Sequence, residues 1–515
     1  MSQNLQNKID SSQIPFYVTR VTETLEKAGF EAYIVGGCVR DLLIGRNPKD
    51  WDVTTNATPE QIIPIFDKTV YENKFGTVAV VFEPDVTHVT SDIVSRETNS
   101  DVTPETYTVE VTPYRTETTY SDNRHPDEVK FSKTLEEDLK RRDFTINAMA
   151  YSISSNSLID LYNGQKDLKD MSLKAVGDPQ ERFNEDALRM LRAVRFSVEL
   201  GLTIAHETME GVIHNAELIK RVSFERIRDE FEKIILSPSP STGVDMLQKF
   251  GLLKHIVPEL EEGIGCDQKG EHIYDVYYHL LHALQHAAEK NWPLEVRLAA
   301  LFHDIGKPKT RRWDGTKAGG KGKYTFYGHE VVGARMAAKI MDRLKFPKKV
   351  TDLVVSLVRQ HMFFSDTEKI TLSAVRRIVA KVGKEHIWTL MEVRECDRVG
   401  MKKKEAPYRL RKYHAMIEEV LRDPISVSQL AIDGNILMNE LGMKAGPRMG
   451  WILHALLEEV LDDPAKNTRE YLDSRVGELE KLSDSELKAL GEKAREAREE
   501  LEGEEVKKLH RKHGV

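Results

Sequence analysis

Residues 35–60 read VGGCVRDLLIGRNPKDWDVTTNATPE, and this stretch decides how the first part of the chain folds. A short apolar run at 32–35 has the composition of a strand and leads directly into Gly36 and Gly37, after which helical spacing begins. A strand that passes through two glycines into a helix presents backbone N–H groups at the helix N-terminus, where a phosphate is stabilised. Arg40, one helical turn further on, can reach the same anion with a bidentate fork. A glycine pair alone also suits an ordinary tight turn, so the phosphate site depends on its surroundings.

Two aspartates in the same stretch indicate a divalent metal site. Asp50 and Asp52 open a second strand, and because side chains alternate along a strand, their carboxylates share one face, roughly 6–7 Å apart at Cα. Two such acids repel each other unless cations relieve the repulsion, and two-metal sites hold their ions about 3.5–4 Å apart for phosphoryl chemistry. A third strand is expected at 75–82, and a further one at 107–112 alternates apolar and polar residues, which places Glu110 on its polar face. We expect Glu110 to be the third acidic ligand; an exposed strand residue is the alternative.

The composition is that of a helix-rich globular protein. The 515 residues carry 75 Lys and Arg against 83 Asp and Glu, a net charge of −8, with 40% hydrophobic residues. This length predicts roughly three or four domains, and no apolar run approaches the ~18 residues of a membrane span. Three cysteines lie far apart in the sequence, which favours a reducing cytoplasm over a disulfide framework. Helical periodicity dominates from about residue 180, so we expect an α+β protein with a mixed α/β head followed by all-α domains.

Longer motifs connect the chain with a known family. The pattern Gly-Gly-x-x-Arg-Asp followed by Asp-x-Asp resembles the head of the nucleotidyltransferase superfamily related to DNA polymerase β. Residues 35–60 as a whole are similar to the class II tRNA nucleotidyltransferases (CCA-adding enzymes) and bacterial poly(A) polymerases. The resemblance continues in KRRDFTINAMA at 140–150, NEDALRMLRAVRFSVELG at 184–201 and RVSFERIRDEF at 221–231. It implies a polymerase-β-like nucleotidyltransferase head.

The motif at 184–201 indicates how a protein without a nucleic-acid template could choose a base. We expect one helix over 182–196, on which Asp186 and Arg189 are neighbours at i,i+3. Cytosine and adenine both offer an amino donor beside a ring-nitrogen acceptor, whereas uracil and guanine offer a carbonyl beside an N–H. A carboxylate only accepts and a guanidinium only donates, so the pair fits CTP and ATP and leaves polar groups unpaired against UTP or GTP. The alternative is an ordinary intrahelical ion pair.

The resemblance adds roles for neighbouring residues. In the family, the motif EDxxR acts as an amino-acid template, and it is preserved here at 185–189. Two arginines that follow would hold triphosphate or primer phosphates, the second arginine of the motif at 140–150 would contact the nucleotide, and the aspartate after it would lie near the ribose. The nucleotide-binding residues that we expect are Gly36, Gly37, Arg40, Arg142, Asp143, Asp186, Arg189, Arg192 and Arg195.

Two segments of the head need separate mention. A polar insertion at 83–105 replaces the tight hairpin that is usual in the family, and it could shift the strand that carries Glu110. Residues 122–126 resemble the flexible loop that helps such enzymes change from C to A addition.

A second group of candidate site residues lies in the C-terminal half. Residues 300–307 read ALFHDIGK, a helix end with an adjacent His-Asp pair. The ordered set around it resembles the metal ligands of HD-superfamily phosphohydrolases: His279, His303, Asp304, His329, His361 and Asp397. Such imidazole and carboxylate ligands can hold one or two divalent metals and activate water. Two interpretations stay open, namely an active phosphohydrolase that trims 2′- or cyclic phosphates from RNA ends, and an inherited domain used for packing or RNA contact.

These patterns predict a template-independent RNA nucleotidyltransferase that adds or repairs the 3′-terminal CCA of tRNA from CTP and ATP. Asp50 and Asp52, with Glu110, would bind Mg²⁺, one ion activating the terminal 3′-hydroxyl and the other the triphosphate. The expected partners are tRNA, CTP and ATP, with no membrane. The alternatives are a poly(A) polymerase, a partial enzyme that adds only CC or only A, and, from another class, an HD-type phosphohydrolase that acts on RNA ends.

The expected organisation has four parts: a catalytic head at 14–165, a helical neck with base-reading and RNA-binding elements at 166–262, an HD domain at 263–425 and a helical tail at 426–515. The tail contains a partial match to a tRNA-holding segment and ends in a charged helix. A Gly/Lys-rich loop is expected at 313–323, and residues 303–323 hold seven Lys and Arg against two Asp. The basic residues are therefore concentrated in a few segments, and a net charge of −8 does not exclude RNA.

Overall fold

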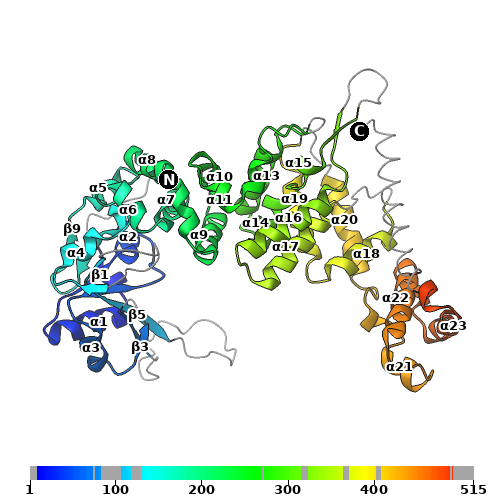
Figure 1. The fold of residues 1–515 in the computed structure, drawn as a ribbon. Helices are drawn as coiled ribbons and strands as arrows, with labels where there is room; N and C mark the ends of the chain where they lie inside the picture. The colour runs from blue at the N-terminus through cyan, green and yellow to red at the C-terminus, as the bar shows by residue number, and fades with distance from the viewer. Residues whose placement is uncertain are drawn as a thin grey trace. The chain divides into compact units, whose positions relative to one another are not determined.

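Figure 1 shows the fold in a computed structural model, which describes residues 9–72, 76–82, 106–117, 129–268, 272–314, 323–362, 370–401, 407–487 and 490. The chain divides into two compact units, Met1–Pro258 and Glu259–Val515. The insertion at 83–105, the loop at 122–126, the middle of the Gly/Lys-rich loop and most of the charged C-terminal segment lie outside the described residues. The finer division into head, neck, HD domain and tail stays a prediction.

A seven-stranded mixed sheet forms the centre of the first unit, in the order β3-β4-β5-β2-β1-β8-β9. Its strands are β1 (Ala32–Val35), β2 (Asp52–Thr55), β3 (Thr69–Glu72), β4 (Thr77–Phe82), β5 (Tyr107–Pro113), β8 (Met149–Ser152) and β9 (Ser157–Asp160). The strands expected at 32–35 and 107–112 are confirmed, and the second strand begins at Asp52 rather than before it.

The register between β2 and β5 brings two of the expected metal ligands together. The two strands run parallel, and Asp52 pairs with Glu110 while Val53 pairs with Val111. The ladder is closed by the Glu110 N–H, which donates to the Trp51 carbonyl at 3.1 Å. Paired residues on neighbouring strands face the same side of a sheet, so Asp52 and Glu110 share one face and the fully buried Val53 and Val111 share the other. The insertion before β5 therefore does not displace Glu110 from Asp52.

Two helices, one before and one after β1 in the chain, pack against this strand. The helix α1 (Phe16–Lys27) presents Val18, Val21 and Leu25 to the core, and each of them is fully buried. The helix α2 (Gly37–Leu43) begins immediately after Gly36, which has φ 82°. The positive φ is costly for any residue except glycine, so the strand–Gly-Gly–helix turn depends on this position.

The remaining helices of the first unit differ from the prediction at one point. They are α3 (Pro59–Ile62), α4 (Leu135–Lys140), α5 (Gly164–Lys169), α6 (Pro179–Glu185), α7 (Leu188–Leu200), α8 (His206–Asn215), α9 (Phe224–Leu236), α10 (Pro240–Lys249) and α11 (Leu253–Ile256). The single helix predicted over 182–196 is wrong, because the chain is extended at Asp186, with φ −142° and ψ 104°. The Asp186 carboxylate accepts from the Leu188 N–H at 3.0 Å and so starts a new helix.

The second unit begins with a bundle of helices. They are α13 (Val276–Glu289), α14 (Leu294–Phe302), α15 (Lys307–Thr310), α16 (His329–Arg343), α17 (Lys348–Gln360), α18 (Leu372–Val382), α19 (Ile387–Asp397) and α20 (Pro407–Val420). The helix α14 contacts α13, α17 and α19, and its residues from Val296 to Phe302 are all buried (Figure 1). The loop predicted at 313–323 begins and ends in strands, since β12 (Arg312–Asp314) and β13 (Lys323–Thr325) pair as a hairpin.

The C-terminal helices have an apolar cluster of their own. They are α21 (Gly434–Asn439), α22 (Pro447–Asp462) and α23 (Arg469–Leu479), and the cluster includes the fully buried Ile432, Ile452 and Leu456. Among all described helices, none combines the length and the apolar composition that crossing a bilayer requires. The architecture is therefore the expected α+β one, with a mixed head followed by helices.

Candidate functional site

A hollow of about 400 Å³ lies in the first unit, where β1 turns into α2 and β2 begins. Its lining contains six arginines and three aspartates, so its net charge is positive, as a triphosphate requires. The lining residues are Gly36, Gly37, Arg40, Asp50, Asp52, Arg141, Arg142, Asp143, Asn147, Arg189, Arg192, Arg195 and Phe196. Ten of them were expected from the sequence. Of the expected site residues in the head and neck, Glu110 and Asp186 lie outside this lining, although both are in the described part of the chain.

Gly36 allows an arginine to approach the backbone. A Cβ atom at this position would lie 2.9 Å from Nη1 of Arg142 and 3.8 Å from Oδ2 of Asp52. Arg142 is fixed in this place by Asp138, which is fully buried and accepts from its Nη2 at 3.1 Å. The guanidinium of Arg142 and the Asp52 carboxylate therefore both lie close to the glycine turn.

The acidic side of the hollow has the oxygen donors that Mg²⁺ prefers. Burial raises the pKa of Asp52; Arg142 opposes this increase, and the neighbouring Asp50 carboxylate raises the pKa further. A cation between the two carboxylates would remove both penalties on the ionised form. Glu110, which is exposed beside Asp52, offers a third carboxylate on the same face of the sheet. The donor set fits a hard divalent cation.

A chain of hydrogen bonds joins two of the arginines that line the hollow, Arg40 and Arg192. Arg40 Nη1 donates to Asn147 Oδ1 at 2.7 Å, and Asn147 Nδ2 donates to Asp143 Oδ1 at 3.1 Å. Arg192 Nε donates to the other oxygen of Asp143 at 2.7 Å. Burial disfavours the ionised Asp143, but the charge of Arg192 and the hydrogen bond from Asn147 outweigh this effect and lower its pKa to about 2. Asp143 is thus a buried anion that holds arginines in place.

Phe196 separates three of the positive charges. Its ring centroid lies 4.1 Å from the guanidinium carbon of Arg195 and 5.2 Å from those of Arg40 and Arg192. Such cation–π contacts stabilise guanidinium groups that would otherwise repel one another. Sequence reasoning missed Phe196 and Asn147, although both belong to the family motifs quoted above.

The intrahelical ion pair between Asp186 and Arg189, which was the alternative to base reading, is not formed. Asp186 Oδ2 accepts from Nη2 of Arg226, in α9, at 2.8 Å. Arg189 is buried and donates to Glu185 Oε2 at 2.6 Å and to the Arg141 carbonyl at 2.9 Å. The break between α6 and α7 is the reason, because it turns the Asp186 carboxylate away from the helix face that carries Arg189. Arg189 alone of the two lines the hollow.

In the second unit, all six expected histidine and aspartate side chains meet. They form two groups that share Asp304, and within each group the ligand atoms lie within 4.8 Å of one another. The first group is His279, His303, Asp304 and Asp397, and the second is Asp304, His329 and His361. Burial opposes ionisation of Asp304, but Lys307 and His303 lower its pKa well below the usual range. The shared carboxylate is therefore an anion.

Backbone carbonyl groups orient three of the imidazoles. Nδ1 of His303, His329 and His361 lies 2.7–2.8 Å from the carbonyl oxygen three residues earlier. This contact requires the proton on Nδ1 and leaves a lone pair on Nε2, which is how proteins orient metal-ligating histidines. The Nε2 atoms of His329 and His361 lie 3.2 and 3.7 Å from Asp304 Oδ1, and neither has a hydrogen-bond partner among the described residues. Lone pairs that face a carboxylate fit a divalent cation.

Two further residues belong to this cluster. Lys307 is buried, and its Nζ lies 2.6 Å from Asp304 Oδ2 and 2.6 Å from Gln268 Oε1. The His272 ring lies 5.3 Å from that of His279, and burial lowers the pKa of His272 to about 4. Lys307 could have been found from the sequence as the last residue of the ALFHDIGK motif. His272 could have been found as a further histidine shortly before His279.

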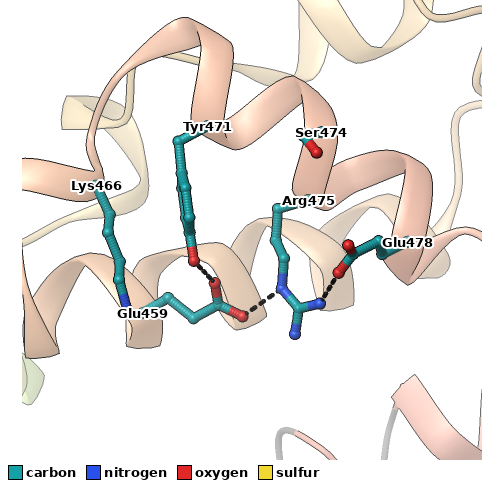
Figure 2. A pocket seen from close by; sticks show the side chains of 6 residues that line it. All are labelled: Glu459, Lys466, Tyr471, Ser474, Arg475 and Glu478. Carbon is teal, nitrogen blue, oxygen red and sulfur yellow. Dashed lines mark hydrogen bonds and ion pairs between the residues drawn. The ribbon is translucent and has the colours of Figure 1, made fainter.

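A separate hollow lies in the tail, between α22 and α23 (Figure 2). Glu459 accepts there from the Tyr471 hydroxyl at 2.8 Å and from Nε of Arg475 at 2.7 Å, and Arg475 also pairs with Glu478. These acids and bases are satisfied by one another. We therefore assign the hollow to the packing of the tail.

The comparisons with known proteins agree with this geometry. Residues 32–174 match the Poly A polymerase head domain, 201–264 match the "Probable RNA and SrmB- binding site of polymerase A", and 276–401 match the HD domain. The fold and the hollow thus define a nucleotidyltransferase head followed by an HD domain. The chain therefore carries a Poly A polymerase head domain, an RNA-binding segment of the same type and an HD domain in this order, and its fold is similar to that of a CCA-adding enzyme.

Named relatives are CCA-adding enzymes. The chain is 46% identical over 219 residues to that of Lactobacillus helveticus, covering 42% of this chain and 49% of the relative, and 37% identical over 302 residues to that of Geobacillus thermodenitrificans, covering 57% and 65%. The aligned part thus spans about half the length of the first relative. The crystal structure of the Bacillus stearothermophilus CCA-adding enzyme in complex with CTP has a TM-score of 0.65 at 27% identity, over 91% of this chain and 99% of that one.

The buried Asp143 predicts a pH dependence of stability. Its pKa of about 2 lies below the ordinary 3.8, so the carboxylate stabilises the fold above about pH 4, and this contribution, about 2 kcal/mol, is lost as the pH falls toward 2. We expect the free energy of unfolding, from urea titrations at pH 5 to 2.5, to fall less steeply for Asp143→Asn than for the unchanged chain. The exposed Asp170→Asn should keep the original slope. Equal slopes for all three proteins would contradict the buried ion pair.

Proposed function

We propose that this chain transfers nucleotides from CTP and ATP to the 3′ end of RNA and so adds or repairs the CCA of tRNA. The observation that carries the proposal is the hollow of the head, whose lining combines Asp50 and Asp52 with six arginines and the Gly-Gly turn. The names of the relatives support tRNA as the substrate, and the CTP complex of the Bacillus stearothermophilus enzyme supports the nucleotide.

In this proposal the arginines bind and orient the triphosphate. Arg40, Arg142 and Arg192 are held by Asn147, Asp138 and Asp143, so their positions are set before the nucleotide enters. Preorganised cations of this kind stabilise the charge that develops on the phosphate oxygens during transfer. Asp50 and Asp52, with Glu110 beside them, would hold Mg²⁺, which supplies activation of the 3′-hydroxyl and neutralisation of the triphosphate.

Base choice is assigned to Arg189 and Asp186. Arg189 lines the hollow and is held by Glu185 and by the Arg141 carbonyl, so its donors have a fixed direction. Asp186 caps α7 and is held by Arg226, which makes it rigid as well. A rigid donor and a rigid acceptor discriminate bases because a mismatched base leaves a buried polar group unpaired.

The first test is nucleotide addition to a tRNA that lacks CCA, with labelled CTP and ATP supplied together or singly. We expect three added residues; a long ladder would instead show a poly(A) polymerase, and no addition would refute the proposal. Asp52→Asn should lower incorporation of both nucleotides at least about a hundredfold, because transition-state charge is no longer stabilised. Asp67→Asn, an exposed change in the same head, should keep full activity.

A second variant separates base choice from chemistry. Arg189→Ala should lower the preference for CTP over UTP about tenfold, since an unsatisfied buried polar group costs about 1–3 kcal/mol, while part of the incorporation of CTP remains. The measurement is kcat/KM for each nucleotide. Arg228→Ala, in α9 and paired with Asp229, is the matched control and should leave the preference unchanged. If Arg189→Ala keeps the same preference for CTP over UTP, Arg189 does not read the base.

A second candidate activity rests on the HD cluster. We propose that the groups around Asp304 hold one or two divalent metal ions and that the domain hydrolyses phosphates at RNA ends. The metal supplies activated water when bound, and Lys307, 2.6 Å from Asp304, is placed to neutralise a phosphate oxygen nearby. The orientation of three imidazoles by backbone carbonyls supports the ligand role.

Metal content tests this second candidate. We expect His279→Ala to lose metal from the HD domain, measured by equilibrium dialysis of the full chain against Ni²⁺, and to lose hydrolysis of bis-p-nitrophenyl phosphate. His282→Ala is the matched control, since this histidine is exposed on the same helix. If both variants bind as much Ni²⁺ as the unchanged chain, the cluster is not a metal site.

A further inference from the structure

The hairpin of β12 and β13 lies in the sequence between two ligand residues of the HD cluster. It follows Asp304 and α15 and precedes His329, the first residue of α16. Trp313 pairs with Tyr324 across the two antiparallel strands. The segment from Asp304 to His329 therefore leaves the HD cluster, forms the hairpin and returns to the cluster.

One face of the hairpin combines aromatic rings with an arginine. Arg311 and Trp313 are two residues apart and therefore share a face with Tyr324. The Arg311 guanidinium carbon lies 3.7 Å from the centroid of the Tyr324 ring, and Trp313 contacts the same ring edgewise at 4.9 Å between centroids. Trp313 nevertheless remains 54% exposed, and Tyr327, just beyond β13, is 56% exposed. We call Arg311, Trp313 and Tyr324 the hairpin face.

The end of the hairpin is fixed to the HD centre. The carbonyl of Phe326, the residue after β13, lies 2.8 Å from Nδ1 of His329. Lys307 Nζ lies 5.7 Å from the centroid of the Phe326 ring and 2.6 Å from Asp304 Oδ2. A molecule held on the hairpin would therefore lie on a segment whose base is anchored at the metal-ligand cluster.

We propose that the hairpin face binds single-stranded RNA and holds its end at the HD centre. Exposed aromatic rings stack on unpaired bases, and a neighbouring guanidinium both strengthens the stack and neutralises the backbone. Arg312, exposed on the opposite face of β12, adds a second positive charge. Double-stranded RNA offers no free base faces, so the hairpin face favours the unpaired end of an RNA. The choice of RNA rests on the proposed action of the chain on RNA 3′ ends.

The test uses the full chain and a labelled 12-nucleotide single-stranded RNA that ends in a phosphate. Fluorescence anisotropy should show that Trp313→Ala weakens binding about tenfold, the loss typical of one stacking aromatic residue. Trp313→Phe should restore most of the affinity, because a ring is again present. Trp388→Ala, at a tryptophan of the same unit that is 36% exposed and contacts His414, should bind as the unchanged chain does. Base stacking should also quench a fluorescence component that Trp313→Ala lacks.

Each outcome decides the proposal. Equal affinity of Trp313→Ala and the unchanged chain overturns it, as does equal loss with duplex RNA, which would indicate backbone contact without stacking. A hairpin that captures a protein and no RNA would also overturn it. Nucleotide addition to tRNA is measured in parallel. Loss of RNA binding in Trp313→Ala together with no addition by the unchanged chain would leave the hairpin site standing while the proposed transfer fails. If the unchanged chain adds nucleotides to tRNA and Trp313→Ala binds RNA as tightly as the unchanged chain, only the hairpin site is refuted.

Discussion

The first unit depends on buried carboxylates that hold arginines together. Six guanidinium groups line one hollow and would repel one another, yet Asp138, which is fully buried, accepts from Arg141 at 2.6 Å and from Arg142 at 3.1 Å. Asp143 does the same for Arg192. Breaking a buried pair of this kind leaves an uncompensated charge and costs about 3–5 kcal/mol. The positive field of the hollow and the stability of the head are therefore two results of one arrangement.

Much of the head could be predicted from the sequence because its signals are local. The β-branched strands, the glycine turn and the alternation around Glu110 each follow from neighbouring residues, and the parallel register then placed Glu110 beside Asp52. The break at Asp186 could not be predicted, since helical spacing over 182–196 is satisfied whether or not the helix is continuous. At the break the Asp186 carboxylate accepts from Arg226, forty residues further along the chain, and such a contact depends on how α9 packs, which local spacing does not show.

The HD cluster, too, could be predicted from the sequence only in part. The order of its ligands along the chain indicated a metal site, and the structure brings all six together. The sequence did not indicate which groups orient His303 and His361. Both histidines follow the last residue of a helix, where backbone carbonyl groups lack intrahelical partners and can accept from the imidazole. The helix ends thus serve two purposes: they finish α14 and α17, and they aim the imidazoles.

Asp304 belongs to both ligand groups, and this sharing has a consequence for substitutions at this position. Three of the four histidines, His303, His329 and His361, are oriented by their own backbone carbonyls rather than by the carboxylate. If both groups bind metal as proposed, one codon change at Asp304 would remove a ligand from each of them at once and leave the helical scaffold intact.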